Sequence, residues 1–110
     1  MKALVLHNGK LDEKEIEKLE KEKVKVIFRK TKEGEIIAFF PELKANHGNI
    51  LSYMHIGQHS EASVRFYWTT KKAFEDEYKD LLNELVGIYD DCILDVKYRL
   101  YYDDLLKAWE

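Results

Sequence analysis

Three of the four histidines lie in residues 40–63, a stretch that also contains the only proline. His55 and His59 are four residues apart, a spacing that places two imidazoles on one face of a helix and suits a metal ion. Gly57 lies between them, and strand-like segments flank the stretch, so an extended chain with the histidines on one face is the other arrangement. Zinc usually takes a third or fourth ligand, which His47 supplies in the hypothesis of a metal-dependent hydrolase. In the alternative hypothesis, both imidazoles hydrogen-bond the loop backbone or a neighbouring side chain.

Other catalytic patterns are weaker. Cys92 begins a predicted strand, where a cysteine is typically a small core residue rather than a reactive thiolate. Ser52 and Ser60 lack the glycine-framed elbow of a nucleophilic serine. The chain has no phosphate loop and no dinucleotide fingerprint, and no pair of carboxylates is marked out for acid–base chemistry. We therefore expect a protein without catalysis and without a cofactor.

Recognition of a ligand is the chemistry that the stretch suits best. It combines hydrogen-bond donors and acceptors with aromatic and imidazole rings, which match the edges and faces of a nucleotide. Arginine on a neighbouring sheet face would bind phosphate through its fork of N–H groups. The alternative is that the arginines are ordinary solvated surface charges. The candidate ligand-binding residues are Asn49, Ser52, Tyr53, His55, Gln58, His59, Arg29, Arg65 and Tyr67.

Composition limits the class of protein. The chain has 110 residues, 45% hydrophobic and 35% charged, which is typical of one globular domain. A net charge of −3 argues against general nucleic-acid binding, which requires a basic surface. One cysteine permits no disulfide framework, and the apolar run near the N-terminus is too short for a signal peptide or a membrane span. We expect a cytoplasmic protein that does not bind membranes.

The residue patterns predict the elements that hold these side chains. Alternation predicts strands over residues 24–31, 64–69 and 92–101, and an apolar run predicts a further strand over 35–40 after a turn at Gly34. An apolar stripe with three- and four-residue spacing predicts the main helix over 74–85, ended by Gly87. Shorter elements are a strand at 3–6, a capped helix at 12–22 and a terminal helix at 102–109.

The predicted fold class is α+β. The element order (β)αββ-loop-βαβα indicates a two-layer sandwich, in which one main helix covers an antiparallel-rich sheet. Residues 1–110 form a single domain, with an N-terminal extension at 1–22, a core at 23–101 and a helical tail at 102–110. Residues 40–63 are the long recognition loop between the hairpin and the next strand. The uncovered sheet face suggests a homodimer.

Several segments carry a family resemblance: VIFRK at 26–30, EIIAFFPE at 35–42, SYMHIGQHSEAS at 52–63 and EYKDLLNELVGIYDD at 77–91. Together they resemble a family of short uncharacterised proteins of bacteria, phages and mobile elements, over residues 24–98. Its most specific part comprises Ser52, Tyr53, His55, Gly57, Gln58 and His59. Gly87 is shifted relative to the family pattern, and the segments before residue 23 and after residue 99 depart from it. The resemblance implies a genomic setting in which small accessory proteins often counteract host defence.

Three functional hypotheses follow. The first is a phage or mobile-element accessory protein that sequesters a small nucleotide without catalysis, using residues 40–63 and the arginine-bearing face. The second is a protein–protein inhibitor of a host defence system with an acidic surface. Its candidate patch is Asp90, Asp91, Asp103 and Asp104. The third is the metal-dependent hydrolase built on His47, His55 and His59.

Overall fold

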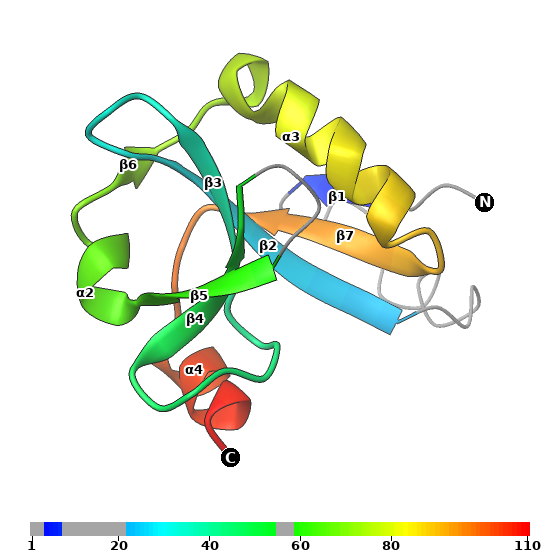
Figure 1. Ribbon diagram of the computed structural model, residues 1–110. Coiled ribbons are helices and arrows are strands. Elements are labelled where there is room, and N and C mark those ends of the chain that lie inside the picture. Colours follow the sequence, from blue (N-terminus) through cyan, green and yellow to red (C-terminus); the bar gives the residue numbers. More distant parts are fainter. Residues whose placement is uncertain (1–3, 8–21, 55–58) are drawn as a thin grey trace.

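The computed structural model describes residues 4–7, 22–54 and 59–110, and it shows an α+β domain (Figure 1). Within those residues a mixed seven-stranded sheet is combined with three helices. The α+β class predicted from the sequence is therefore confirmed. The elements in chain order are β1 (Leu4–His7), β2 (Glu22–Lys30), β3 (Ile36–Phe40), β4 (Asn49–Tyr53), β5 (His59–Ser63), α2 (Val64–Tyr67), β6 (Lys71–Lys72), α3 (Glu75–Ile88), β7 (Cys92–Lys97) and α4 (Tyr102–Ala108).

The sheet has the strand order β1-β7-β2-β3-β4-β5. Strands β1, β7 and β2 are parallel neighbours, whereas β3, β4 and β5 continue the sheet in antiparallel pairing. Strand β7 pairs with residues 22–27 of β2, and β6 pairs with Arg29 and Lys30. Because β3 occupies the other edge of β2, β6 continues the line of β7 beyond the point where β7 ends.

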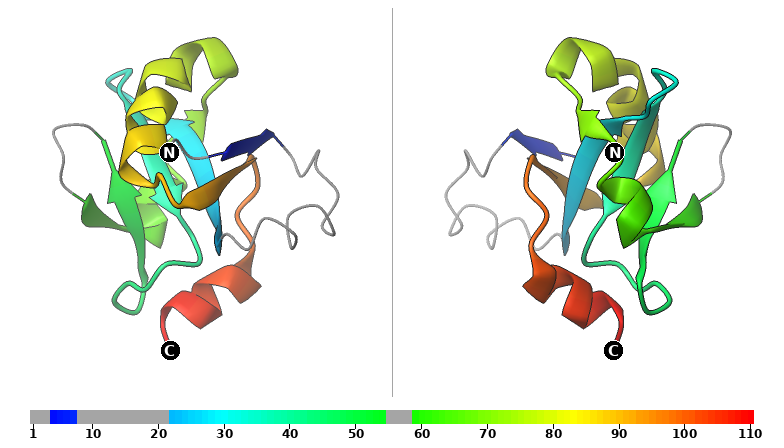
Figure 2. Two further views of the ribbon diagram at one scale, coloured as in Figure 1. Left: turned by 90° about the vertical axis from the view of Figure 1, so that its right-hand side faces the viewer. Right: turned by 90° about the vertical axis from the view of Figure 1, so that its left-hand side faces the viewer.

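Helix α3 covers one face of the sheet (Figures 1 and 2). Its buried side chains Tyr78, Leu81, Leu82 and Leu85 pack against residues from β2, β3 and β7. The Phe28 and Tyr78 rings stack with centroids 4.3 Å apart and planes 10° from parallel. The predicted main helix and its apolar stripe are thereby confirmed.

The opposite face is covered as well. Tyr67 of α2 and Leu105 of α4 pack with residues of β2, β3 and β4 in a second buried cluster: Ile27, Ile37, Phe39 and Ile50. Lys25 Nζ lies 3.1 Å from Asp104 Oδ2, and Trp109 Nε1 donates to the Asn49 carbonyl oxygen at 2.8 Å. These contacts fasten α4 to the sheet, so the face that a two-layer arrangement leaves open is filled by the chain's own helices.

The predicted strand over residues 64–69 is wrong. The Ser63 hydroxyl accepts a hydrogen bond from the Phe66 N–H at 3.0 Å, which is the N-cap of the short helix α2. Tyr67 is buried while Phe66 and Trp68 are exposed, so the alternating aromatic pattern reflects one inward residue of a helical turn. The strand of this region is β5, which lies earlier in the chain.

Other boundaries also differ from the sequence-based expectations. Residues 40–63 are not one long loop, because they contain β4 and β5. Helix α3 continues through Gly87 to Ile88, and β7 ends at Lys97 rather than near residue 101. The predicted helix at 12–22 falls almost entirely outside the described residues. No helix in the described ranges is both long enough and apolar enough to cross a membrane.

Gly48 and Gly87 form a matched pair that tests these boundaries. Gly48 precedes β4 with a φ of +86°, Gly87 lies inside α3, and a Cβ added at either meets nothing within 4 Å. We expect Gly48→Ala to lower the free energy of unfolding by about 1 kcal/mol, because alanine resists that backbone conformation. Gly87→Ala should raise it by about 0.5 kcal/mol, because alanine favours a helix. Urea denaturation measures both changes, and a loss on Gly87→Ala would contradict the helical assignment.

Candidate functional site

The structure divides the predicted ligand-binding residues between the two faces of the sheet. Side chains alternate along a strand, so Ser52 and Tyr53 of β4 point to opposite sides. Arg29, Ser52 and Tyr67 lie on the side of α2, whereas Tyr53 and His59 lie on the side of α3. Asn49 begins β4, and Arg65 is exposed in α2. His55 and Gln58 lie outside the described residues.

The Arg29 side chain makes contacts within the protein. Its Nε donates to Thr70 Oγ1 at 3.0 Å and its Nη2 donates to the Thr70 carbonyl oxygen at 2.7 Å. The guanidinium carbon lies 4.7 Å from the centroid of the buried Tyr67 ring. Burial raises the pKa of Tyr67, and the nearby Arg29 charge partly opposes that rise. Arg29 therefore ties β2 to the connection between α2 and β6.

Tyr53, His59, Glu84 and Tyr89 form a polar group that we call the tyrosine–histidine cluster. The Tyr53 hydroxyl donates to Glu84 Oε1. His59 Nε2 lies 2.6 Å from the Tyr89 hydroxyl oxygen, and the His59 ring lies 5.1 Å from that of Tyr53. Phe40 packs against the rings of both His59 and Tyr89. The cluster joins the start of β5 and the end of β4 to the last turn of α3.

Burial raises the pKa of Tyr89 to about 12, with a smaller contribution from Cys92. A phenol that stays protonated is a hydrogen-bond donor, so Tyr89 is suited to donate to His59 Nε2. Tyr53 donates to a carboxylate in the same way. The internal hydrogen bonds therefore engage both tyrosine hydroxyls, and the His59 ring packs against the rings of Phe40 and Tyr53.

Glu84 and Tyr89 were absent from the candidates derived from the sequence. Both come from the end of α3, about thirty residues beyond the strands that they contact. One local signal existed, because Glu84 lies three residues after Leu81 and directly before Leu85, at the border of the apolar stripe. Nothing in the sequence pattern shows which strand that border faces.

The three-histidine metal site receives no support from the described residues. His47 precedes β4 and packs against the Trp109 ring, with centroids 4.6 Å apart. His59 pairs with Tyr53 at the opposite end of β4. A five-residue strand spans roughly 17 Å, which is too far for two ligands of one ion. No group of three or more candidate metal ligands occurs in the described ranges.

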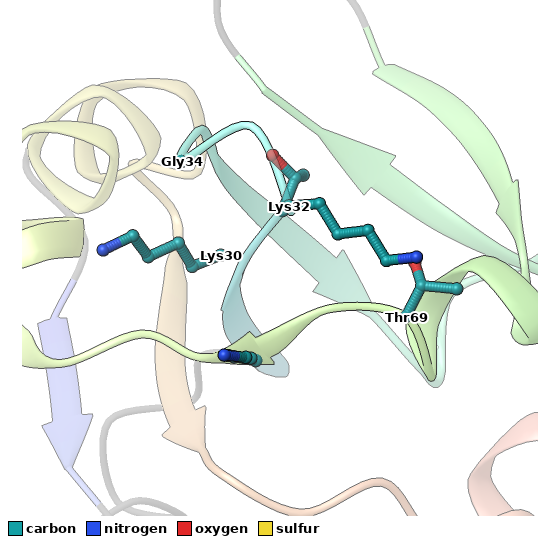
Figure 3. A pocket seen from close by; sticks show the side chains of 6 residues that line it. Lys30, Lys32, Gly34 and Thr69 are labelled. Carbon is teal, nitrogen blue, oxygen red and sulfur yellow. The ribbon is translucent and has the colours of Figure 1, made fainter.

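A cationic hollow lies at the end of β2, and we call it the lysine pocket (Figure 3). It has a volume of about 320 Å³ and lies between the β2–β3 turn and the α2–β6 connection. The Lys32 side chain extends towards Thr69 across this hollow, as Figure 3 shows. The lining residues are Lys30, Thr31, Lys32, Gly34, Thr69 and Lys71.

Local chemistry shapes the lysine pocket. The turn is closed by Gly34, whose φ of +86° lets its N–H donate to the Thr31 carbonyl oxygen at 2.9 Å. Lys30 Nζ lies 2.7 Å from Glu77 Oε2, and this contact raises the pKa of Lys30 and lowers that of Glu77. Lys32 and Lys71 form no ion pair with any described residue. Two ammonium groups of the pocket are thus available to an anion.

The acidic residues predicted to form one patch are separated. Asp90 and Asp91 are exposed in the turn before β7, and Asp103 is exposed in α4, which follows the other end of β7. Asp104 is buried and paired with Lys25. An exposed acidic surface built from all four residues is therefore not present.

No protein-family model, curated protein or solved structure matches this chain. Its class is defined by architecture: an α+β domain whose mixed sheet carries one main helix. Among the described residues, the lysine pocket and the tyrosine–histidine cluster are sites that combine polar or charged side chains from different elements.

A double-mutant cycle tests the cluster. We expect Tyr53→Phe to lower the free energy of unfolding by about 2 kcal/mol, because a hydrogen bond to a carboxylate is lost. In the Glu84→Gln background the same change should cost less, giving a coupling energy above about 0.5 kcal/mol. Urea denaturation of the four proteins measures the coupling, and strictly additive losses would show that the two side chains do not interact.

A pH titration tests the ion pair beside the lysine pocket. The pKa of Glu77 is lowered in the folded protein from its ordinary value of 4.5, first by Lys30 and then by the Phe74 N–H. The stability that ionised Glu77 contributes is therefore present above pH 4.5. It is lost as the pH falls through the lower pKa of the folded protein. We expect Glu77→Gln to lose less stability than the wild type between neutral and acidic pH, and equal losses would contradict this assignment.

Proposed function

We propose that this protein is a non-catalytic binding protein for a small ligand of nucleotide type, and that the lysine pocket holds the ligand's phosphate. The observation that carries the proposal is a hollow lined by three lysines and two threonines in a chain of net charge −3. A cationic hollow in an acidic protein concentrates an anionic ligand locally without attracting nucleic acid in general.

The chemistry of the lining suits phosphate. Lys32 and Lys71 approach from two different connections and supply ammonium groups that can turn towards the oxygens of an anion. The Thr31 hydroxyl already accepts from the Glu35 N–H at 3.1 Å, which leaves its own proton for a phosphate oxygen. Lys30 also lines the pocket, but its ammonium group is paired with the Glu77 carboxylate, so Lys32 and Lys71 supply the net positive charge.

The size of the pocket limits the ligand. At about 320 Å³ it lies near the lower end of the range for small-molecule sites, which is about 300–1,000 Å³. A phosphate with its sugar fills such a hollow, and the base would extend over its rim. A mononucleotide or small cyclic nucleotide is therefore a better match than a dinucleotide cofactor.

Sequestration is favoured over turnover by the side chains present. The described residues that line the pocket carry ammonium and hydroxyl groups, and none carries a carboxylate, imidazole or thiol. The Glu77 carboxylate nearby is occupied by Lys30 and by the Phe74 N–H. The resemblance to phage and mobile-element proteins supports a setting in which binding a defence signal, without converting it, is sufficient.

Titration with a panel of mononucleotides and cyclic nucleotides tests the proposal. We expect at least one to raise the melting temperature, and the Lys32→Ala/Lys71→Ala double variant to lose about tenfold or more in affinity by calorimetry. Lys44→Ala/Lys79→Ala is the matched control, because it removes the same charge from exposed positions outside the pocket. Equal affinity of the two double variants would exclude the lysine pocket as the site.

The fate of the ligand distinguishes binding from catalysis. After incubation at a substoichiometric ligand concentration, the protein is denatured and the released nucleotide is analysed by chromatography. Intact nucleotide agrees with sequestration. Converted nucleotide that depends on Lys32 and Lys71 would contradict the non-catalytic function.

A further inference from the structure

Strand β5 ends the sheet on the side away from β1, and in the described part of the chain it pairs only with β4 (Figure 1). It comprises His59–Ser63, and all of its residues except Ala62 are exposed. An edge strand presents backbone N–H and C=O groups that a further strand can pair with. Proteins usually protect such an edge with proline or with charged side chains, lysine above all.

Strand β5 lacks that protection. It contains no proline and no lysine, and the carboxylate of its one acidic residue, Glu61, forms hydrogen bonds within the protein. Glu61 Oε1 accepts from the Asn46 N–H at 2.9 Å and from Asn49 Nδ2 at 3.2 Å. Oε2 accepts from Asn46 Nδ2 at 3.3 Å. These bonds, the Asn46 N–H first, lower the pKa of Glu61 and hold its carboxylate over the β3–β4 connection.

A groove of about 380 Å³ runs beside β5 on the face of the sheet that α2 covers. Apolar side chains from three elements and from the end of β4 line it together with serine hydroxyls. Phe66 forms part of its wall and is 38% exposed. The lining residues are Ile37, Ser52, Met54, Ser60, Glu61, Ala62, Ser63 and Phe66.

We propose that the β5 edge binds an extended segment of a partner protein, which adds a strand to the sheet and places apolar side chains into the groove. Main-chain hydrogen bonds supply affinity in this mode, and pockets for alternate side chains supply specificity. The intervening side chains of the segment would lie on the opposite face of the sheet, and the net charge of −3 favours lysine or arginine among them. The five residues of β5 limit the contact to a short segment.

Charge favours such a partner over a second copy of this chain. A second copy would bring another chain of net charge −3 to the edge, whereas a basic segment complements that charge. This binding site is separate from the lysine pocket and does not depend on the proposed nucleotide function.

A defined peptide tests the inference. The probe is a labelled, end-capped seven-residue peptide of alternating valine and lysine, and binding is followed by fluorescence anisotropy. We expect saturable binding with a dissociation constant below about 1 mM. We also expect slower hydrogen exchange of the β5 amides in the complex. The same peptide with N-methylated backbone amides should not bind, because its hydrogen-bond donors are blocked. An alternating valine–glutamate peptide should bind more weakly.

Two exposed aromatic residues that are two positions apart provide matched variants. Phe66→Ser removes a wall of the groove and should lower the affinity for the probe about fivefold or more. Trp68→Ser changes an exposed aromatic residue that does not line the groove, and should leave probe affinity unchanged. The Lys32→Ala/Lys71→Ala variant should also bind the probe normally, so failure of the nucleotide proposal and failure of this one are distinguishable.

Several results would overturn the inference. These are absence of saturable binding, equal binding of the N-methylated peptide, or unchanged exchange of the β5 amides. A dimer in sedimentation equilibrium whose β5 amides are already protected without peptide would assign the edge to a second copy instead.

Discussion

Strand β2 is buried on both faces, and the rest of the fold depends on the need to cover both. Val26, Ile27 and Phe28 are consecutive and fully buried, so both faces of the strand need apolar cover. Helix α3 covers one face, while α2 and α4 cover the other. Strands β3 and β7 occupy its two edges, which leaves its backbone groups paired along most of its length.

The polar side chains of the lysine pocket lie where the burial of β2 ends. At Arg29 and Lys30 the strand leaves the cores, and β6 replaces β7 as its neighbour. Arg29 binds Thr70 and so draws the α2–β6 connection against β2. That contact brings Thr69 and Lys71 beside Lys32, and the lysine pocket is the result. The lysine pocket therefore forms because the α2–β6 connection packs against the end of β2.

Local patterns predicted the elements whose burial is regular. Alternation identified β2, the apolar stripe identified α3, and Gly34 marked the hairpin turn with its positive φ. The pattern was ambiguous at Val64 and Tyr67, because residues three apart share a helix face while Phe66 between them and Trp68 after them are exposed. Strand β4 escaped prediction because its residues show no clear alternation and it lies among turn-forming residues.

The sites depend on contacts between distant residues, which sequence patterns do not show. Tyr53 and His59 were identified, but their partners Glu84 and Tyr89 come from another element. The lysine pocket requires the two-residue strand β6, which is too short to produce any periodicity. The predicted arginine-bearing site assumed one sheet face, whereas Arg29 is enclosed by α2 and Arg65 lies on that helix.

The most direct measurement is an amide chemical-shift titration with inorganic pyrophosphate, which carries the phosphate chemistry without the base. The account predicts the largest shifts at residues 30–34 and 69–71, weakening as salt concentration rises. Shifts centred instead on Tyr53, His59 and Tyr89, or no localised shifts, would contradict the assignment of the lysine pocket.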